Sequence, residues 1–194
     1  MGFFSQRISK IQPSVTMSIS AKAKSLKEEG KDIINFSAGE PDFDTPENIK
    51  NSGIQAIKDG QTKYTPVNGT KELRNAIIKK FKKENNLHFS HDEITVGCGG
   101  KQVIYNALLA TIDKGDEIII PSPYWVSYPD MALIVEGEPK VLECSLENNF
   151  KINPQDLEKC ITNRTKWLIL NSPSNPTGTM YSELELMNIA KILL

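Results

Sequence analysis

A glycine-rich segment carries residues that suit the binding of a phosphate group. It runs Gly97-Cys98-Gly99-Gly100-Lys101, between a short apolar stretch and an apolar helical pattern. Glycines let a backbone approach an anion closely, and the amides that begin the next helix point at it. A Walker loop would need glycine at Thr95, and a dinucleotide fingerprint would need glycine at Gln102, so both motifs fail. A tight turn whose glycines serve packing explains the segment equally well.

A second segment offers flat aromatic faces. In Ser122-Pro123-Tyr124-Trp125-Val126-Ser127-Tyr128-Pro129, two aromatic residues directly follow an apolar strand pattern. Aromatic side chains at this place can stack on a planar ring. Taken alone, the pair is better explained by core packing at a sheet edge.

A third segment combines a rigid backbone with an amide side chain. Asn171-Ser172-Pro173-Ser174-Asn175-Pro176-Thr177-Gly178 follows another apolar strand pattern. Prolines and a glycine hold the chain in one shape, and Asn175 could then present a hydrogen bond to a ligand. Asn-Pro segments are also common turns. The occurrence of all three segments at successive strand ends favours a shared binding site.

The elements that must position these segments alternate between helices and short strands. We expect an extended piece at 33–36 and strands at 94–96, 117–120, 139–144 and 167–170. We expect helices over 16–29, from 46 (capped by Thr45) to near 60, from 70 onward, and over 103–112, 130–135, 154–160 and from near 182. Continuous apolar strands separated by helices predict an α/β fold, a mostly parallel sheet with helices on both faces. In such a sheet, ligands bind outside the carboxyl ends of the strands. The last helical pattern ends on Leu193 and Leu194 with no capping signal, so we expect this domain to be incomplete at its C-terminus.

Composition excludes several classes of function. The 194 residues are 39% hydrophobic and 24% charged, with a net charge of -1, so no basic field exists to attract nucleic acid or a membrane. Cys98, Cys144 and Cys160 lack the spacing of a disulfide framework or a zinc site, and His88 and His91 fall in a polar connection. We therefore expect no metal. The N-terminus has no apolar stretch suited to a signal sequence or membrane span, so we expect a cytoplasmic protein.

The ordered motifs resemble those of the class I aminotransferases of fold type I, which use pyridoxal 5'-phosphate. The resemblance is greatest to the bacterial aspartate aminotransferases, and it covers this chain as their N-terminal portion. It implies that 1–45 form an N-terminal arm and part of a small domain. It implies that 46–194 form the first part of the cofactor-binding large domain. The motifs that carry it are Gly39 to Pro46, Tyr64 in Lys63-Tyr64-Thr65-Pro66, Gly99 to Gln102, Ser122 to Trp125, and Ser172 to Gly178.

The resemblance also implies how the cofactor is held. Gly99, Gly100 and the Lys101 amide would cradle its phosphate. Trp125 would stack on the pyridine ring, and Asn175 would hydrogen-bond the phenolic oxygen of the ring. Both of these residues would also contact the substrate. In this family the Ser122-Pro123 and Asn175-Pro176 bonds are expected to be cis.

Further residues would serve the substrate and the partner subunit. The Gly39 amide would bind the substrate α-carboxylate, and Tyr64 would reach the phosphate of the neighbouring subunit, which requires a homodimer. The Lys101 side chain would contact the distal carboxylate of a dicarboxylic substrate, with help from Ser14 and Thr16.

The activity implied is transfer of an amino group from aspartate or glutamate to a 2-oxo acid, with the cofactor as electron sink. The resemblance places the Schiff-base lysine, the acidic partner of the ring nitrogen and the carboxylate-binding arginine beyond Leu194. This chain would then hold no catalytic residue and be inactive alone. Other specificities stay open: prephenate, aromatic amino acids, alanine or kynurenine. A non-catalytic dimerisation or regulatory remnant, or one half of a split enzyme, also stays open.

Overall fold

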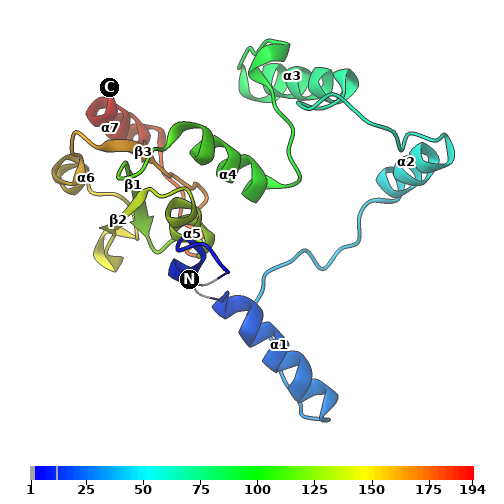
Figure 1. Cartoon of the computed structure of the whole chain (residues 1–194), viewed down its shortest axis with the longest axis horizontal. Coiled ribbons are helices and arrows are strands. Elements are labelled where there is room, and N and C mark those ends of the chain that lie inside the picture. Colours follow the sequence, from blue (N-terminus) through cyan, green and yellow to red (C-terminus); the bar gives the residue numbers. More distant parts are fainter. Residues whose placement is uncertain (1–2, 12) are drawn as a thin grey trace. The chain divides into compact units, whose positions relative to one another are not determined.

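The computed structural model describes residues 3–11 and 13–194 (Figure 1). The chain divides into two compact units. Val15–Val103 form one unit, and the segment up to Ser14 together with Ile104–Leu194 forms the other. Helix α4, Gly100–Thr111, begins in the first unit and ends in the second.

The second unit is built on a parallel sheet. Its strands are β1 (Glu117–Ser122), β2 (Glu138–Glu143) and β3 (Thr165–Leu168), in the order β2-β1-β3. Both neighbours pair with β1 in parallel, which confirms the predicted sheet. The third strand begins and ends two residues earlier than expected. The pairing nevertheless extends past its end, because the Ile169 amide donates to the Ile119 carbonyl at 3.0 Å.

Helices cover both faces of this sheet, as the continuous apolar strand predicted (Figure 1). Ile118 and Ile120 of β1 are buried against α4 and α5, whereas Ile119 is buried against α6 and α7. Successive side chains of a strand point to opposite faces, so this one apolar run supplies both cores. The remaining covering helices are α5 (Ser127–Ile134), α6 (Pro154–Cys160) and α7 (Glu183–Leu193), and the short helix η1 (Ile8–Lys10) contacts α5.

The helices of this unit begin where local signals place them. Asn153 accepts hydrogen bonds from the first amides of α6, with Pro154 as the first helical residue. Ser182 and Glu185 form a reciprocal capping box at the start of α7. A short helix η3 (Leu146–Asn148) lies between β2 and α6.

The first unit contains α1 (Val15–Glu28), α2 (Glu47–Lys58), α3 (Lys71–Asn85) and η2 (His91–Glu93). The prediction that Thr70 caps a helix is confirmed, because its hydroxyl accepts from the Leu73 amide at 3.3 Å. The prediction that Thr45 caps the preceding helix is wrong. Pro46 occupies the cap position with a non-helical ψ of 141°, and its side chain has no atom that could accept a hydrogen bond from the helix.

The predicted strand at 94–96 is also wrong. Residues 94–96 form no strand, although the Val96 amide donates to the Asn68 carbonyl at 3.2 Å. A strand needs a ladder of such bonds to a partner, and one bond does not make a ladder. The extended piece expected at 33–36 likewise lies outside any strand.

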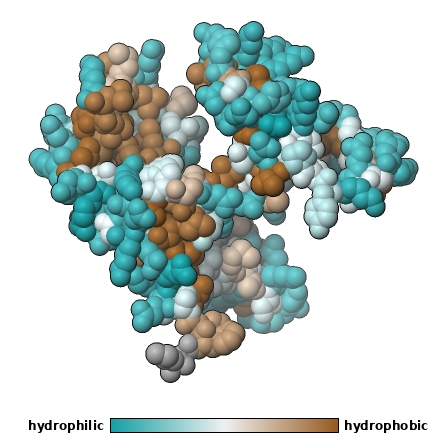
Figure 2. Space-filling view, turned by 45° about the horizontal axis from the view of Figure 1, so that its top comes forward, coloured by the Kyte–Doolittle hydropathy of each residue, from teal (hydrophilic) through white to brown (hydrophobic). Residues whose placement is uncertain are grey.

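Hydrophobic side chains reach the surface in several places (Figure 2). One such place is an open groove of about 490 Å³ along β3 and α7, lined by Trp167, Leu168, Leu186, Ile189 and Leu193 among others. Within the described ranges, β3 pairs only with β1, so its other edge is uncovered. No helix in 3–11 or 13–194 combines the length and the apolar character needed to cross a membrane.

One charged side chain lies within the core of the sheet. Glu117 is fully buried at the amino end of β1. Its carboxylate accepts hydrogen bonds from Thr162 and Thr165 at 2.7 and 3.3 Å, and lies 2.8 Å from Arg164 and 3.7 Å from Lys140. The Thr162 hydrogen bond, together with the two positive charges, lowers the pKa of Glu117 against the opposing effect of burial. This cluster joins β1 to β2 and to the segment before β3.

The charge of Glu117 predicts a specific dependence of stability on pH. A lowered pKa means that its contribution is complete above about pH 4.5 and is lost as the pH falls through the folded-state value. We expect Glu117→Gln to lower the urea midpoint at neutral pH, and we expect the deficit to shrink below about pH 4.5. Urea unfolding followed by circular dichroism at neutral pH and near pH 3.5 measures this. A deficit of equal size at both pH values would show that folding does not lower the pKa of Glu117.

Candidate functional site

The segments that follow β1 and β3 lie together at one edge of the sheet. Because these strands are parallel neighbours, the segments that follow them leave the sheet at the same edge. A narrow pocket there is lined by residues from both segments, and by a residue from the loop after β2. The first segment contributes Pro123, Tyr124 and Tyr128, the second contributes Asn171, Ser174, Asn175 and Tyr181, and the loop after β2 contributes Phe150.

The size of this pocket decides how a ligand could use it. It encloses only about 20 Å³, which is room for about one water molecule. A planar ring therefore cannot enter it and would have to lie against its rim. The aromatic and amide side chains around the pocket act as a wall.

Trp125 does not line this pocket itself, but a ring contact joins it to Tyr128, which does. Its indole meets the ring of Tyr128 edge to face, with centroids 5.4 Å apart and planes at 89°. Tyr128 is buried, and burial raises the pKa of its phenol, which stays protonated. Trp125 itself is half-buried and packs against the apolar cluster under α4 and α5. The plane of the indole is therefore set by the core.

Asn175 is presented by a loop that is hydrogen-bonded to itself. The backbone amide of Asn175 donates to Oδ1 of Asn171 at 2.8 Å. The Gly178 amide donates to the Ser174 carbonyl, and the Ser174 amide donates to the Thr179 carbonyl, both at 2.8 Å. In the part of the chain that the structure describes, nothing hydrogen-bonds to the side-chain amide of Asn175, which is exposed. That amide can donate to a ligand.

Three proline bonds in these two segments are cis. The structure confirms the expected cis bonds at Ser122-Pro123 and Asn175-Pro176. It adds a cis bond at Ser172-Pro173, which the motifs did not predict.

The glycine segment forms a tight turn at the start of α4. A side chain at Gly97 would lie 2.8 Å from Cγ2 of Val103, and Gly99 has a φ of +85°, so both positions favour glycine. The Cys98 amide donates to the side-chain oxygen of Gln102, which closes the turn. A backbone that excludes side chains and leads into a helix start suits a phosphate group.

The other residues implicated by the motifs lie outside the pocket. Gly39 is exposed in a loop, and Tyr64 is fully exposed in the segment between α2 and α3. Lys101 is exposed at the second position of α4. Ser14 directly precedes α1, and Thr16 is in its first turn. The pocket wall comes entirely from 121–181.

Sequence reasoning missed two aromatic residues of the pocket. Phe150 and Tyr181 lie outside the three segments singled out in the sequence, whereas Tyr128 lies within the second of them. A faint signal for Tyr181 was available, since it is an aromatic residue between a polar turn and the Ser182 capping box. Phe150 had no signal, because its role follows from a left-handed backbone with φ of 55°.

Most of the chain matches a known family. A model of the family "Aminotransferase class I and II" matches residues 31–194. The chain belongs to this family. Its members depend in general on pyridoxal 5'-phosphate. Within the described residues, no group of histidine, cysteine, aspartate or glutamate side chains could hold a metal ion.

Relatives and solved structures agree with this assignment. The chain is 57% identical to a "Probable aspartate/prephenate aminotransferase" of Rickettsia conorii, over 100% of this chain and 48% of the relative. It is 56% identical to the "Aspartate/prephenate aminotransferase" of Nitrosomonas europaea, over 97% and 48%. The chain therefore spans about half the length of the curated relatives it matches.

The fold matches two aspartate aminotransferases closely. The Thermus thermophilus enzyme with maleate has a TM-score of 0.95 and 43% identity, over 99% of this chain and 50% of that one. The Rhizobium meliloti enzyme has a TM-score of 0.93 and 48% identity, over 99% and 48%. The fold seen here is thus that of the corresponding part of these enzymes.

The glycine turn provides a matched pair of variants. Added side chains at Gly99 and Gly100 would both meet open space, but only Gly99 has a positive φ. We expect Gly99→Ala to cost about 1–2 kcal/mol of unfolding free energy through backbone strain. Gly100→Ala, at a helical position, should instead stabilise by about 0.4–1 kcal/mol. Urea unfolding compares them, and equal effects would contradict the left-handed turn.

Proposed function

We propose that the protein transfers an amino group between a dicarboxylic amino acid, aspartate above all, and a 2-oxo acid, using pyridoxal 5'-phosphate. The observation that carries this proposal is the wall at the carboxyl edge of the sheet. There a core-held indole and an unengaged asparagine amide follow two neighbouring parallel strands. Membership of the aminotransferase family supports the same activity.

Each residue of the wall has a separate task in this proposal. The cofactor, when bound, supplies an electron sink for the substrate's α-carbon. Trp125 stacks on one face of the ring and fixes its plane. Asn175 donates a hydrogen bond to the phenolic oxygen, which stops the ring from rotating over the indole. Gly99, Gly100 and the Lys101 amide bind the phosphate at the start of α4.

Other assignments complete the proposal. Gly39 binds the substrate α-carboxylate through its amide. Tyr64 binds the phosphate held by a second copy of the chain, so the protein works as a homodimer. Tyr64 is fully exposed, which suits a residue that contacts a ligand of the partner subunit. We further propose that 1–45 belong to an arm and a small domain, and 46–194 to the cofactor-binding domain.

The substrate is proposed to carry a second carboxylate. Maleate, a dicarboxylate, is bound in a Thermus thermophilus relative, and Lys101 offers a cation exposed at the start of α4. Prephenate is the second candidate, because curated relatives are named for both aspartate and prephenate. Prephenate also bears two carboxylates, so one cationic contact can serve both substrates.

Removing the Lys101 charge tests the specificity. In the complete protein, we expect Lys101→Ala to lower kcat/KM for aspartate and glutamate by about 10- to 100-fold, the usual effect of a lost charged hydrogen bond. Activity on alanine and aromatic amino acids should be retained. Lys114→Ala, another exposed lysine just beyond α4, serves as the control. An equal loss for all substrates would assign Lys101 to the phosphate alone.

The chain of 194 residues is expected to be inactive when purified alone. The proposal assigns the lysine that binds the cofactor covalently to the part of the complete protein beyond Leu194. The lysines within the family motifs of this chain, Lys63 and Lys101, are not assigned that role. Aspartate with 2-oxoglutarate, assayed with added pyridoxal 5'-phosphate, should give no turnover above the free cofactor. Turnover by the purified chain would overturn this expectation. Inactivity of the complete protein as well would favour a non-catalytic dimerisation or regulatory role.

A further inference from the structure

We propose that Tyr181 is a positioning residue that aims the Asn175 side chain, acting through the loop between Asn171 and Tyr181. This inference rests on the proposed function, in which Asn175 binds the phenolic oxygen of the cofactor ring. Tyr181 itself touches neither substrate nor cofactor in this proposal. Its task is to hold the base of the loop against the sheet.

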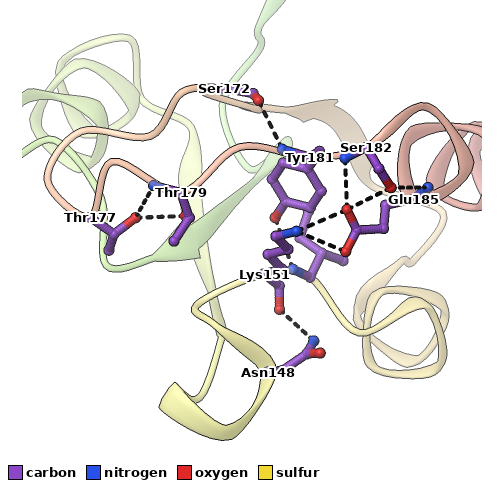
Figure 3. A network of polar contacts seen from close by, with 9 residues as sticks. Asn148, Lys151, Ser172, Thr177, Thr179, Tyr181, Ser182 and Glu185 are labelled. Atoms are coloured by element: carbon purple, nitrogen blue, oxygen red, sulfur yellow. Dashed lines mark hydrogen bonds and ion pairs between the residues drawn. The ribbon is translucent and has the colours of Figure 1, made fainter.

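Tyr181 closes the base of the loop with its backbone. Its amide donates to Oγ of Ser172 at 3.1 Å (Figure 3). Inside the loop, the hydroxyls of Thr177 and Thr179 lie 2.7 Å apart, and the Asn175 amide donates to Asn171. These bonds give the loop its shape. Its placement relative to the strands depends on what holds the ends.

The Tyr181 side chain supplies that anchor. It is buried, lines the same pocket as Asn175, and belongs to the core under α6 and α7. Its hydroxyl accepts a hydrogen bond from the buried Ile152 amide at 2.8 Å. The residue therefore joins the loop after β3 to the segment before α6. Burial raises the pKa of the phenol, so it stays neutral at ordinary pH.

A charged pair fixes the anchor from the other side. Nζ of Lys151 lies 2.9 Å from both carboxylate oxygens of Glu185 and 5.8 Å from the centre of the Tyr181 ring (Figure 3). Glu185 also accepts from the Ser182 amide at 2.7 Å at the start of α7. That backbone bond first, and the Lys151 bond next, lower the pKa of Glu185 to about 2. Glu185 is therefore ionised at neutral pH.

The segment that Tyr181 grips has a conformation that needs support. Asn149 and Phe150 have φ of 51° and 55°, and a bulky residue rarely adopts the left-handed region. The Phe150 amide donates to the Ser145 carbonyl at 2.9 Å, and its side chain lines the pocket with Asn175. Contacts on both sides of Phe150 are needed to keep its backbone in the left-handed region, and the hydrogen bond from Ile152 to Tyr181 is one of these contacts. Loss of this hydrogen bond would allow both Phe150 and the Asn175 loop to move.

The test measures the ionisation of the bound cofactor in the complete protein. The pH midpoint of its visible absorption band reports on the hydrogen bond to the phenolic oxygen. We expect Asn175→Ala to raise this midpoint, because an oxygen that loses its donor holds a proton more strongly. Tyr181→Phe should raise it in the same direction, by about a threefold change in proton affinity. The double variant should match Asn175→Ala alone, because both changes remove one interaction.

Further variants separate positioning from stability. Ser172→Ala removes the hydroxyl that accepts a hydrogen bond from the Tyr181 amide, without altering Tyr181 itself. It should raise the midpoint as Tyr181→Phe does. Tyr105→Phe, a half-buried tyrosine on α4 outside the pocket, is the matched control and should leave it unchanged. Urea unfolding of each variant records the loss of stability independently.

Each result has one meaning. A loss of stability in Tyr181→Phe with an unchanged midpoint would make Tyr181 merely structural and overturn the inference. Full additivity with Asn175→Ala would overturn it too, because Tyr181 would then act by another route. If Asn175→Ala itself leaves the midpoint unchanged, the proposed function of Asn175 fails, and the inference fails with it.

Discussion

β1 and β3 pair in parallel, with Ile118 opposite Trp167 and Ile119 opposite Leu168. The pocket of the candidate site depends on this pairing, because parallel neighbours release their following segments at the same edge. The aromatic segment after β1 and the Asn175 loop are more than forty residues apart in the sequence, yet they line one pocket. At the amino end of the same strand, the buried Glu117 accepts hydrogen bonds from Thr162 and Thr165. The burial of Ile118 to Ile120 and the polar contacts of Glu117 thus both hold β1 against its neighbours.

The two faces of the sheet have different tasks at the site. On the face covered by α4 and α5, the core sets the plane of Trp125 through Tyr128. On the face covered by α6 and α7, the core holds Tyr181 at the base of the Asn175 loop. A ring that stacks on the indole and accepts a hydrogen bond from Asn175 would be positioned by both cores. Preorganisation of this kind lets a site hold its ligand without rearranging at each encounter.

The capping box of α7 links local helix chemistry to the site. Glu185 satisfies the Ser182 amide at the helix start and also binds Lys151, whose ammonium lies over the Tyr181 ring. Glu185 therefore serves the helix end and, through Lys151, contacts the residue proposed to support the Asn175 loop. The narrow pocket explains why such support is needed. With room for only one water beneath it, the wall has little freedom to adjust, so its backbone must be placed correctly from the outset.

Local patterns in the sequence were enough to predict many elements. The run Glu117 to Ile120 predicted a strand buried on both faces, and Thr70 and Pro154 marked helix starts that the structure confirms. The ordered motifs predicted the family, which the comparisons confirm. These signals lie within a few residues of one another, where backbone preference and side-chain periodicity act directly.

The remaining features depend on contacts between distant parts of the chain. Residues 94–96 have the apolar pattern of a strand but no ladder of bonds to a partner, and the pattern does not reveal whether a partner exists. The hydrogen bond from Ile152 to Tyr181 joins residues 29 positions apart, and no periodicity connects them. Phe150 adopts a left-handed backbone that its own residue type disfavours, so only packing and hydrogen bonds around it can hold it there. The residue types of the three candidate segments could therefore be recognised in the sequence. The directions in which their side chains point depend on how the sheet and its helices bring these segments together.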